Sequence, residues 1–297
     1  MIKYFSLFSG IGGLEYGLEK NGIGKCVGYS EIKESSIKIY QSKYLNYNNY
    51  GDITKLDIKG MQDFNLLLGG FPCQSFSLAG IRKGFKDKRG KMIFYIYEIL
   101  KEKKPEYFVL ENVKGLLNHN KGNTYIKVLK LLMFAGYYVR VLLLNSIFYG
   151  SPQNRERIFI LGALDNYDRV IPERIDDRKI FRDIEDKNEN GYKMIPETEN
   201  NIKKVNQRAN YNYELIGGYD RVGALMTSYG CGNKVVRYKD WFRYLTLLEC
   251  ERLQGFPDGW TEGENNRDRY FALGNAVNCN VSDYLFNNYL KEVWRWN

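Results

Sequence analysis

Short apolar runs alternate with segments whose apolar positions follow helical spacing, from the N-terminus to about residue 165. A short apolar run bounded by turn residues predicts a buried strand, and apolar positions repeating at helical spacing predict an amphipathic helix. Alternating strands and helices indicate a mostly parallel sheet flanked by helices, with ligands at the carboxyl ends of the strands. The expected strands are 2–8, 26–29, 66–68, 107–110, 139–144 and 157–161, and the expected helices are 14–20, 37–44, 92–101 and 125–134.

The alternation stops after about residue 165. Residues 165–212 are charged, rich in Asn and Lys and weakly periodic, and several glycines follow before residue 233. We therefore expect loops and short strands, forming a small second domain over residues 178–263. The segment 264–297 has apolar positions at helix spacing, so it is expected to pack back on residues 1–177 and complete the first domain.

Composition and charge narrow the class of partner. The chain has 297 residues, 44% hydrophobic content and a net charge of +9. This charge favours a polyanion such as nucleic acid, although a merely basic surface explains it equally well. No apolar run reaches the roughly 18 residues needed to cross a membrane, and no signal-peptide cleavage pattern follows the N-terminus. We expect a cytoplasmic protein with no membrane partner.

The cysteines and the lone histidine limit the chemistry further. There are five cysteines, none in a CxxC pair, and His119 is the single histidine. A zinc site and a histidine-based catalytic unit are therefore disfavoured, and no metal is expected. Cys73 follows Gly69-Gly70-Phe71-Pro72, at the end of an expected strand. A loop there can display a nucleophilic thiolate, and the alternative is a small buried thiol beside a turn.

A glycine-rich turn, Phe-Ser-Gly-Ile-Gly-Gly-Leu at residues 8–14, joins the first expected strand to a helix. Its glycines let the backbone approach a ligand closely. Glu31, after the second strand, is suited to hold two ribose hydroxyls. The dinucleotide fingerprint would need glycine where Glu15 stands, and acidic neighbours would repel a pyrophosphate. A nucleoside without phosphates, such as S-adenosylmethionine, fits better, and a plain tight turn is the alternative.

Two polar clusters follow later strands. Glu111 comes directly after the expected strand 107–110, where partial burial would raise the carboxyl pKa and let it donate a proton. Arg155 and Arg157 occupy alternate positions of an extended segment and would point the same way. They could hold a base carbonyl, a phosphate or a carboxylate. An exposed helix-capping acid and a surface salt-bridge ladder are the respective alternatives.

Together and in this order, these blocks resemble the DNA (cytosine-5) methyltransferase family of the bacterial or phage restriction-modification type. The resemblance covers nearly the whole chain except about residues 165–240. It implies an α/β fold, with a Rossmann-like S-adenosylmethionine-dependent methyltransferase sheet and a small, mainly loop and β target-recognition domain. The matching blocks are residues 8–14, 70–74, 89–94, 111–113, 153–157, 243–257 and 274–277.

The resemblance implies a mechanism on a cytosine that is flipped out of the DNA stack. Cys73 is expected to add to C6 as a thiolate, while Glu111 binds N3 and the exocyclic amine. Arg157 is expected to hold O2, and Arg155 to lie nearby, shaping the loop or touching phosphate. The resemblance thus gives Cys73, Glu111, Arg157 and Arg155 as the catalytic set.

The resemblance also implies S-adenosyl-L-methionine as cofactor. Phe8 is expected to stack on adenine, Glu31 to hold the ribose, and Asn275 and Val277 to close the methionine end. The family often has a tryptophan after the ribose-binding acid, and this chain has Ile32 instead. The cofactor-binding set is Phe8, Gly10, Ile11, Gly12, Gly13, Leu14, Glu31, Ile32, Asp52, Ile53, Gly70, Pro72, Asn275 and Val277.

Double-stranded DNA is the partner that the resemblance implies. A monomer is expected to methylate a specific sequence, in a system where a cognate restriction endonuclease acts separately. Two alternatives stay open, a tRNA cytosine-5 methyltransferase and a catalytically silent DNA-binding regulator. The candidate DNA contacts are Gln74, Ser77, Arg221, Thr227, Tyr229 and Lys234.

Overall fold

The structure is a computed structural model that describes residues 1–72, 92–166, 175–188, 194–195, 214–228, 234–239 and 241–293. The chain forms two compact units. Unit 1 comprises Met1–Leu144, Glu156–Pro172 and Ser282–Asn297, and unit 2 comprises Asn145–Arg155 and Glu173–Val281. The domain limits expected from the sequence, 1–177 with 264–297 and 178–263, stay a prediction.

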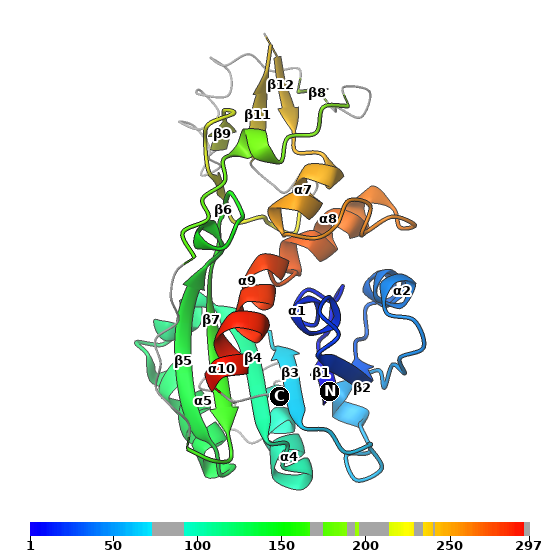
Figure 1. The fold of residues 1–297 in the computed structure, drawn as a ribbon, viewed down its shortest axis with the longest axis vertical. Helices are drawn as coiled ribbons and strands as arrows, with labels where there is room; N and C mark the ends of the chain where they lie inside the picture. Colours follow the sequence, from blue (N-terminus) through cyan, green and yellow to red (C-terminus); the bar gives the residue numbers. More distant parts are fainter. Residues whose placement is uncertain are drawn as a thin grey trace. The chain divides into compact units, whose positions relative to one another are not determined.

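Unit 1 is built on one six-stranded sheet, with the strand order β2-β1-β3-β4-β7-β5 (Figure 1). Strands β2, β1, β3 and β4 run parallel to one another, whereas β7 runs antiparallel to β4. The expectation of a mostly parallel sheet is confirmed. The strands are β1 Ile2–Leu7, β2 Gly24–Ser30, β3 Leu66–Gly70, β4 Tyr107–Val113, β5 Tyr138–Asn145 and β7 Glu156–Ala163.

Helices α1, α2, α4 and α5 of unit 1 fall between these strands, close to where the apolar spacing predicted them. Helix α4 illustrates the cause, because its buried residues Ile93, Ile96, Ile99 and Leu100 recur at helical spacing along one face. The helical elements are α1 Tyr16–Glu19, α2 Glu34–Lys43, η1 Ile53–Lys55, α4 Met92–Lys103, η2 Lys114–Leu117, α5 Asn123–Phe134, the π-helix η7 Leu285–Leu290 and α10 Lys291–Val293, with α9 Cys279–Tyr284 leading into η7.

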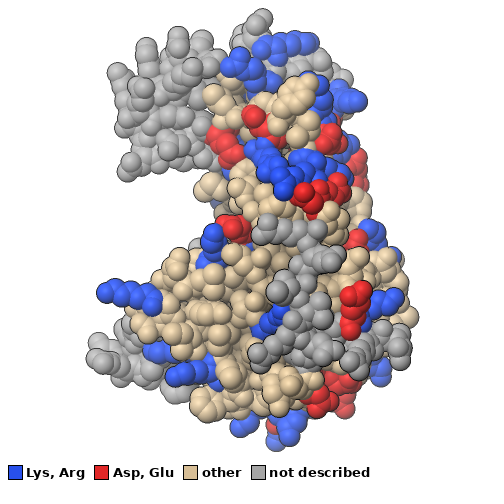
Figure 2. All heavy atoms as spheres, turned by 60° about the vertical axis from the view of Figure 1, so that its left-hand side comes forward, with Lys and Arg blue, Asp and Glu red and all other residues tan. Residues whose placement is uncertain are grey.

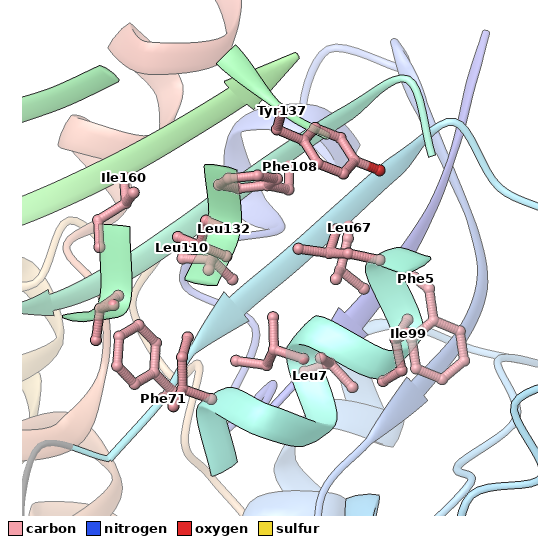
Figure 3. Packing of buried hydrophobic residues seen from close by; sticks show 14 of the residues in the cluster. Phe5, Leu7, Leu67, Phe71, Ile99, Phe108, Leu110, Leu132, Tyr137 and Ile160 are labelled. Carbon is pink, nitrogen blue, oxygen red and sulfur yellow. The ribbon is translucent and has the colours of Figure 1, made fainter. Parts of the chain in front are cut away.

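The main core lies between one face of the sheet and helices α4 and α5. Phe5 and Leu7 of β1 join Phe108 and Leu110 of β4 in this core (Figure 3). Successive side chains of a strand point to opposite faces. Ser6, between Phe5 and Leu7, therefore points to the other face, where it donates a hydrogen bond to Glu15 at the start of α1.

Unit 2 contains short strands, as the broken pattern predicted, and also the helices α7 and α8, which that pattern did not predict. A four-stranded sheet has the order β8-β12-β11-β9, and β6 pairs with β10. Helix α7 begins at a capping box in which Thr246 and Glu249 each bond the other's backbone N–H. The elements are η3 Ser146–Phe148, β6 Gln153–Asn154, η4 Phe181–Asp183, β8 Met194–Ile195, β9 Glu214–Ile216, β10 Val222–Gly223, β11 Lys234–Tyr238, β12 Trp241–Tyr244, α7 Leu247–Leu253 and α8 Asn266–Asn275.

Candidate active site

The glycine-rich turn leaves β1 through a strained backbone. Phe8 has φ +54°, Gly10 φ +58° and Gly12 φ +85°. The left-handed region is rare for an aromatic residue, and holding such a residue there costs roughly 1–3 kcal/mol. At Gly12 a Cβ would lie 2.1 Å from Cε2 of Tyr44. Only glycine fits beside this ring, whose hydroxyl donates to the Gly12 carbonyl at 2.9 Å.

Glu31 lies at the end of β2, next to this turn. Its Oε2 accepts from the Gly10 N–H at 2.9 Å, and its Oε1 accepts from the N–H groups of Ile32 at 2.8 Å and Lys33 at 2.9 Å. Three backbone donors therefore fix the carboxylate at the carboxyl edge of the sheet. The Ile32 side chain is 73% exposed, so an apolar surface lies open beside this carboxylate.

Asn49 links Glu31 to the segment with Asp52 and Ile53. Its Nδ2 donates to the Glu31 carbonyl at 3.0 Å, and its Oδ1 accepts from Glu31 N at 3.2 Å and Gly51 N at 3.0 Å. Asp52 accepts from Thr54 N at 2.9 Å, and Ile53 is buried. Asn49 was not predicted from the sequence. The signal that could have identified it is its position two residues before Gly51, a spacing at which an asparagine side chain can accept a hydrogen bond from its own backbone in a turn.

A second cluster lies where β3 and β4 end side by side. Gly70 pairs with Glu111 in the sheet register, and a Cβ on Gly70 would lie 3.5 Å from Glu111 Oε2. Arg157 Nε lies 3.0 Å from Glu111 Oε1, with side-chain exposures of 18% and 12%. A largely buried ion pair thus stands beside the residues that lead to Cys73.

Glu111 was expected directly after its strand, but it lies within it. Strand β4 continues to Val113, because its antiparallel partner β7 pairs Glu111 with Phe159 and Val113 with Arg157. The expected strand was too short, since a charged residue normally marks the end of a buried run. Pairing with β7 explains how Arg157 meets Glu111.

Asn112 ties this cluster to Phe71, which follows β3 and lies two residues before Cys73. It is 2% exposed, and its Nδ2 donates to the Phe71 carbonyl at 2.8 Å. Pro72 follows and is exposed. Asn112 was not predicted from the sequence as a site residue, because the expected strand ended at residue 110. Cys73, Gln74, Ser77 and Tyr229 lie outside the residues that the structure describes.

Arg155 belongs to unit 2, where its guanidinium is bound by backbone carbonyl groups. It is 2% exposed and donates to Ala276 O at 2.8 Å, Gly274 O at 3.0 Å and Leu225 O at 3.4 Å. Its bonds therefore fix the backbone on both sides of Asn275. Asn275 is exposed and donates to Phe271 O at 3.0 Å, and Val277 is half-buried.

The candidate DNA contacts of unit 2 differ in exposure. Arg221 and Thr227 are exposed. Lys234 is buried, and its Nζ lies 3.3 Å from Glu214 Oε2, so a contact with DNA would require this ion pair to open. Figure 2 shows Lys and Arg side chains interspersed with Asp and Glu over the face in view.

Membrane-spanning helices and clusters of metal ligands are both absent from the described parts of the chain. No described helix is long and apolar enough to cross a membrane. No group of three or more His, Cys, Asp or Glu side chains is placed to hold a metal ion among the described residues.

The sheet, the glycine-rich turn and the strand-end carboxylate define an α/β methyltransferase fold. A solved structure, the Entamoeba histolytica methyltransferase EhMeth, shares this fold with a TM-score of 0.82 and 22% sequence identity, covering 98% of each chain. The sequence model of the C-5 cytosine-specific DNA methylase family matches residues 2–291. The chain belongs to this family.

Relatives of known name differ in how much of their length this chain matches. It is 38% identical to Type II methyltransferase M.NgoBI of Neisseria gonorrhoeae over 293 residues, which are 95% of this chain and 90% of that protein. It is 48% identical to the orphan methyltransferase M.SPRI of Bacillus phage SPR over 169 residues, which are 56% of this chain. That match spans only 38% of the phage protein.

Proposed function

We propose that this chain is a sequence-specific DNA (cytosine-5) methyltransferase that uses S-adenosyl-L-methionine. The observation that carries the proposal is the Glu111–Arg157 pair, held beside the loop that leads to Cys73. An acid and a guanidinium at one strand end can bind two edges of a flat heterocycle. Family membership supports cytosine as that heterocycle.

The proposed cofactor site fits a nucleoside without phosphates. The turn offers close backbone approach at Gly10 and Gly12, and the Glu31 carboxylate is held at the neighbouring strand end. The Glu31 carboxylate would repel a pyrophosphate, whereas it suits ribose hydroxyls. Asp52, Ile53, Gly70 and the remaining residues of the expected set are proposed to complete the site. When bound, S-adenosylmethionine supplies an electrophilic methyl group.

The proposed chemistry needs no histidine. Cys73 Sγ, as a thiolate, forms a bond to cytosine C6, which makes C5 nucleophilic. Glu111 donates a proton to N3, and Arg157 stabilises the charge that develops at O2. After C5 has gained the methyl group, a water molecule takes the C5 proton, the C6–sulfur bond breaks to release the Cys73 thiolate, and N3 returns its proton to Glu111. Arg155 acts as a positioning residue, because its bonds hold the segment around Asn275.

The proposed substrate is duplex DNA with the target base flipped out, since C5 and C6 are inaccessible inside the stack. Arg221 and Thr227, exposed in unit 2, are proposed contacts together with Gln74, Ser77 and Tyr229. Lys234 would join them after leaving Glu214. Basic side chains would bind phosphates, and the net charge of +9 favours this.

We place the reaction in a restriction-modification system, in which methylation protects host DNA from a separate endonuclease. The similarity to a protein named Type II methyltransferase supports this setting. The enzyme is proposed to act as a monomer in the cytoplasm.

The test is bisulfite sequencing of unmethylated plasmid incubated with the pure protein and S-adenosylmethionine. We expect protected cytosines within one short motif. The control is the Cys73→Ser variant, which should protect none. Protection absent from DNA but present in tRNA would transfer the activity to RNA, and protection of neither substrate by folded, cofactor-bound protein would leave a silent DNA binder.

A further inference from the structure

Glu15, which directly precedes α1, is a buried acid that the proposed reaction does not use. Its side chain is 0% exposed. The Ser6 hydroxyl of β1 donates to its Oε1, while Oε2 is buried without a hydrogen-bond partner among the described residues. A carboxyl placed in this way is costly to ionise, because water cannot reach it.

The groups around Glu15 add to this cost. A negative charge on Glu15 would face the carboxylates of Glu19 on α1 and Glu31 after β2. It would also interact with two phenols and a thiol, which carry no positive charge. The surrounding groups are Tyr4 of β1, Glu19 of α1, Cys26 of β2, Glu31 and Tyr40 of α2.

Glu15 stands at the far end of the strained glycine-rich turn. The turn is held from several sides, by Tyr44 at the Gly12 carbonyl and by the Ser282 hydroxyl, which donates to Leu14 O at 2.5 Å. The Ser6–Glu15 bond joins the end of the turn to the strand from which the turn departs. It therefore ties the two ends of the turn together.

We propose that Glu15 is a positioning residue whose neutral carboxyl group ties the start of α1 to β1 and holds the glycine-rich turn in its cofactor-binding conformation. This inference rests on the proposed function of the turn. Burial raises the Glu15 pKa to about 7, although hydrogen bonds from Ser6 and from its own backbone lower it, and the charges of Glu19 and Glu31 raise it further by smaller amounts. The carboxyl therefore titrates in the physiological range. Ionisation would leave a buried negative charge on Glu15. The turn would have to rearrange before water could reach this charge.

Cofactor affinity should then fall as the pH rises through 7. About nine-tenths of Glu15 is neutral at pH 6 and about one-tenth at pH 8, and the apparent Kd scales with the inverse of the competent fraction. If only the neutral form binds, the Kd rises about tenfold between these pH values.

The experiment is titration calorimetry with S-adenosylhomocysteine, whose amino and carboxylate groups keep their charges from pH 6 to 8. We expect the wild-type Kd to rise about tenfold across this range. Glu15→Gln, a neutral isostere, should keep one Kd throughout, near the wild-type value at pH 6. The control is Glu34→Gln on α2, an exposed acid whose carboxylate pairs with Lys38, and this variant should keep the wild-type rise.

A second readout needs no variant. In buffers of different ionisation enthalpy, the wild-type protein should take up close to one proton on binding at pH 8. A Glu15→Gln variant with the wild-type pH slope, or binding without proton uptake, would overturn the positioning role. Absence of S-adenosylhomocysteine binding to the wild type at pH 6 would instead refute the proposed cofactor site.

Discussion

Replacing Gly12 by alanine tests the structure of the proposed cofactor turn most directly. The new Cβ would have to share space with the Tyr44 ring, 2.1 Å away, at a backbone φ of +85°. The left-handed conformation costs an L-residue roughly 1–2 kcal/mol. Moving the ring would also break the Tyr44 hydroxyl bond to Gly12 O, which contributes roughly 0.5–1.5 kcal/mol.

The combined cost of Gly12→Ala is therefore about 1.5–3.5 kcal/mol. If the turn relaxes to another conformation, this cost appears as a Kd for S-adenosylhomocysteine that is about 13- to 370-fold higher. If the turn keeps its conformation, the free energy of unfolding falls by the same amount. Calorimetry and urea unfolding on one preparation should together account for the total.

Two controls separate the contributions. Tyr44→Phe removes only the hydroxyl, so its Kd should rise about 2- to 12-fold. Gly22 also has a positive φ, +63°, but an added Cβ there meets nothing within 4 Å. Gly22→Ala should lose roughly 1–2 kcal/mol of stability and bind with the wild-type Kd. A Gly12→Ala protein with both wild-type stability and wild-type affinity would refute this account of the turn.

Three further outcomes are expected. Glu111→Gln should slow methylation about 10²- to 10⁴-fold with cofactor affinity unchanged, and a normal single-turnover rate would remove its role as proton donor. DNA binding should weaken steeply between 50 and 200 mM salt through counterion release, and a flat response in a filter-binding assay would contradict a phosphate-dominated interface. The Glu15 pKa lies above its ordinary value of 4.5. The contribution of neutral Glu15 to the free energy of unfolding is therefore fully present below pH 4.5 and is lost as the pH rises to about 7. Glu15→Gln should therefore gain up to about 3 kcal/mol on the wild type between pH 5 and 8, measured by urea unfolding.

Strands and helices of unit 1 could be predicted from the sequence because their apolar periodicity is strong. Strand ends were less predictable. The run 107–110 is apolar, but β4 reaches Val113, since its hydrogen bonds depend on β7 rather than on the polarity of Glu111. Long-range pairing of this kind leaves no local signal.

The roles of charged residues could be predicted only in part. Arg155 and Arg157 look equivalent in sequence, yet carbonyl groups of unit 2 bind the first and the Glu111 carboxylate binds the second. Lys234 looks like a phosphate ligand, but it is buried against Glu214. Residue type gives the charge of a side chain, whereas burial and partners depend on the folded backbone.

The block at residues 243–257, one of those that resemble the family, has a largely structural basis. Arg243 and Glu249 are both 0% exposed and form a two-point ion pair, Nη1–Oε2 at 2.8 Å and Nη2–Oε1 at 2.7 Å. Glu251 accepts from the N–H groups of Gly259 and Thr261, both at 2.8 Å. Removing one partner of a buried ion pair costs roughly 3–5 kcal/mol, because the other charge stays buried and unpaired. The folding of unit 2 is therefore sufficient to explain these residue types, and the proposed DNA contacts fall on exposed residues instead, among which Arg221 and Thr227 are the described candidates.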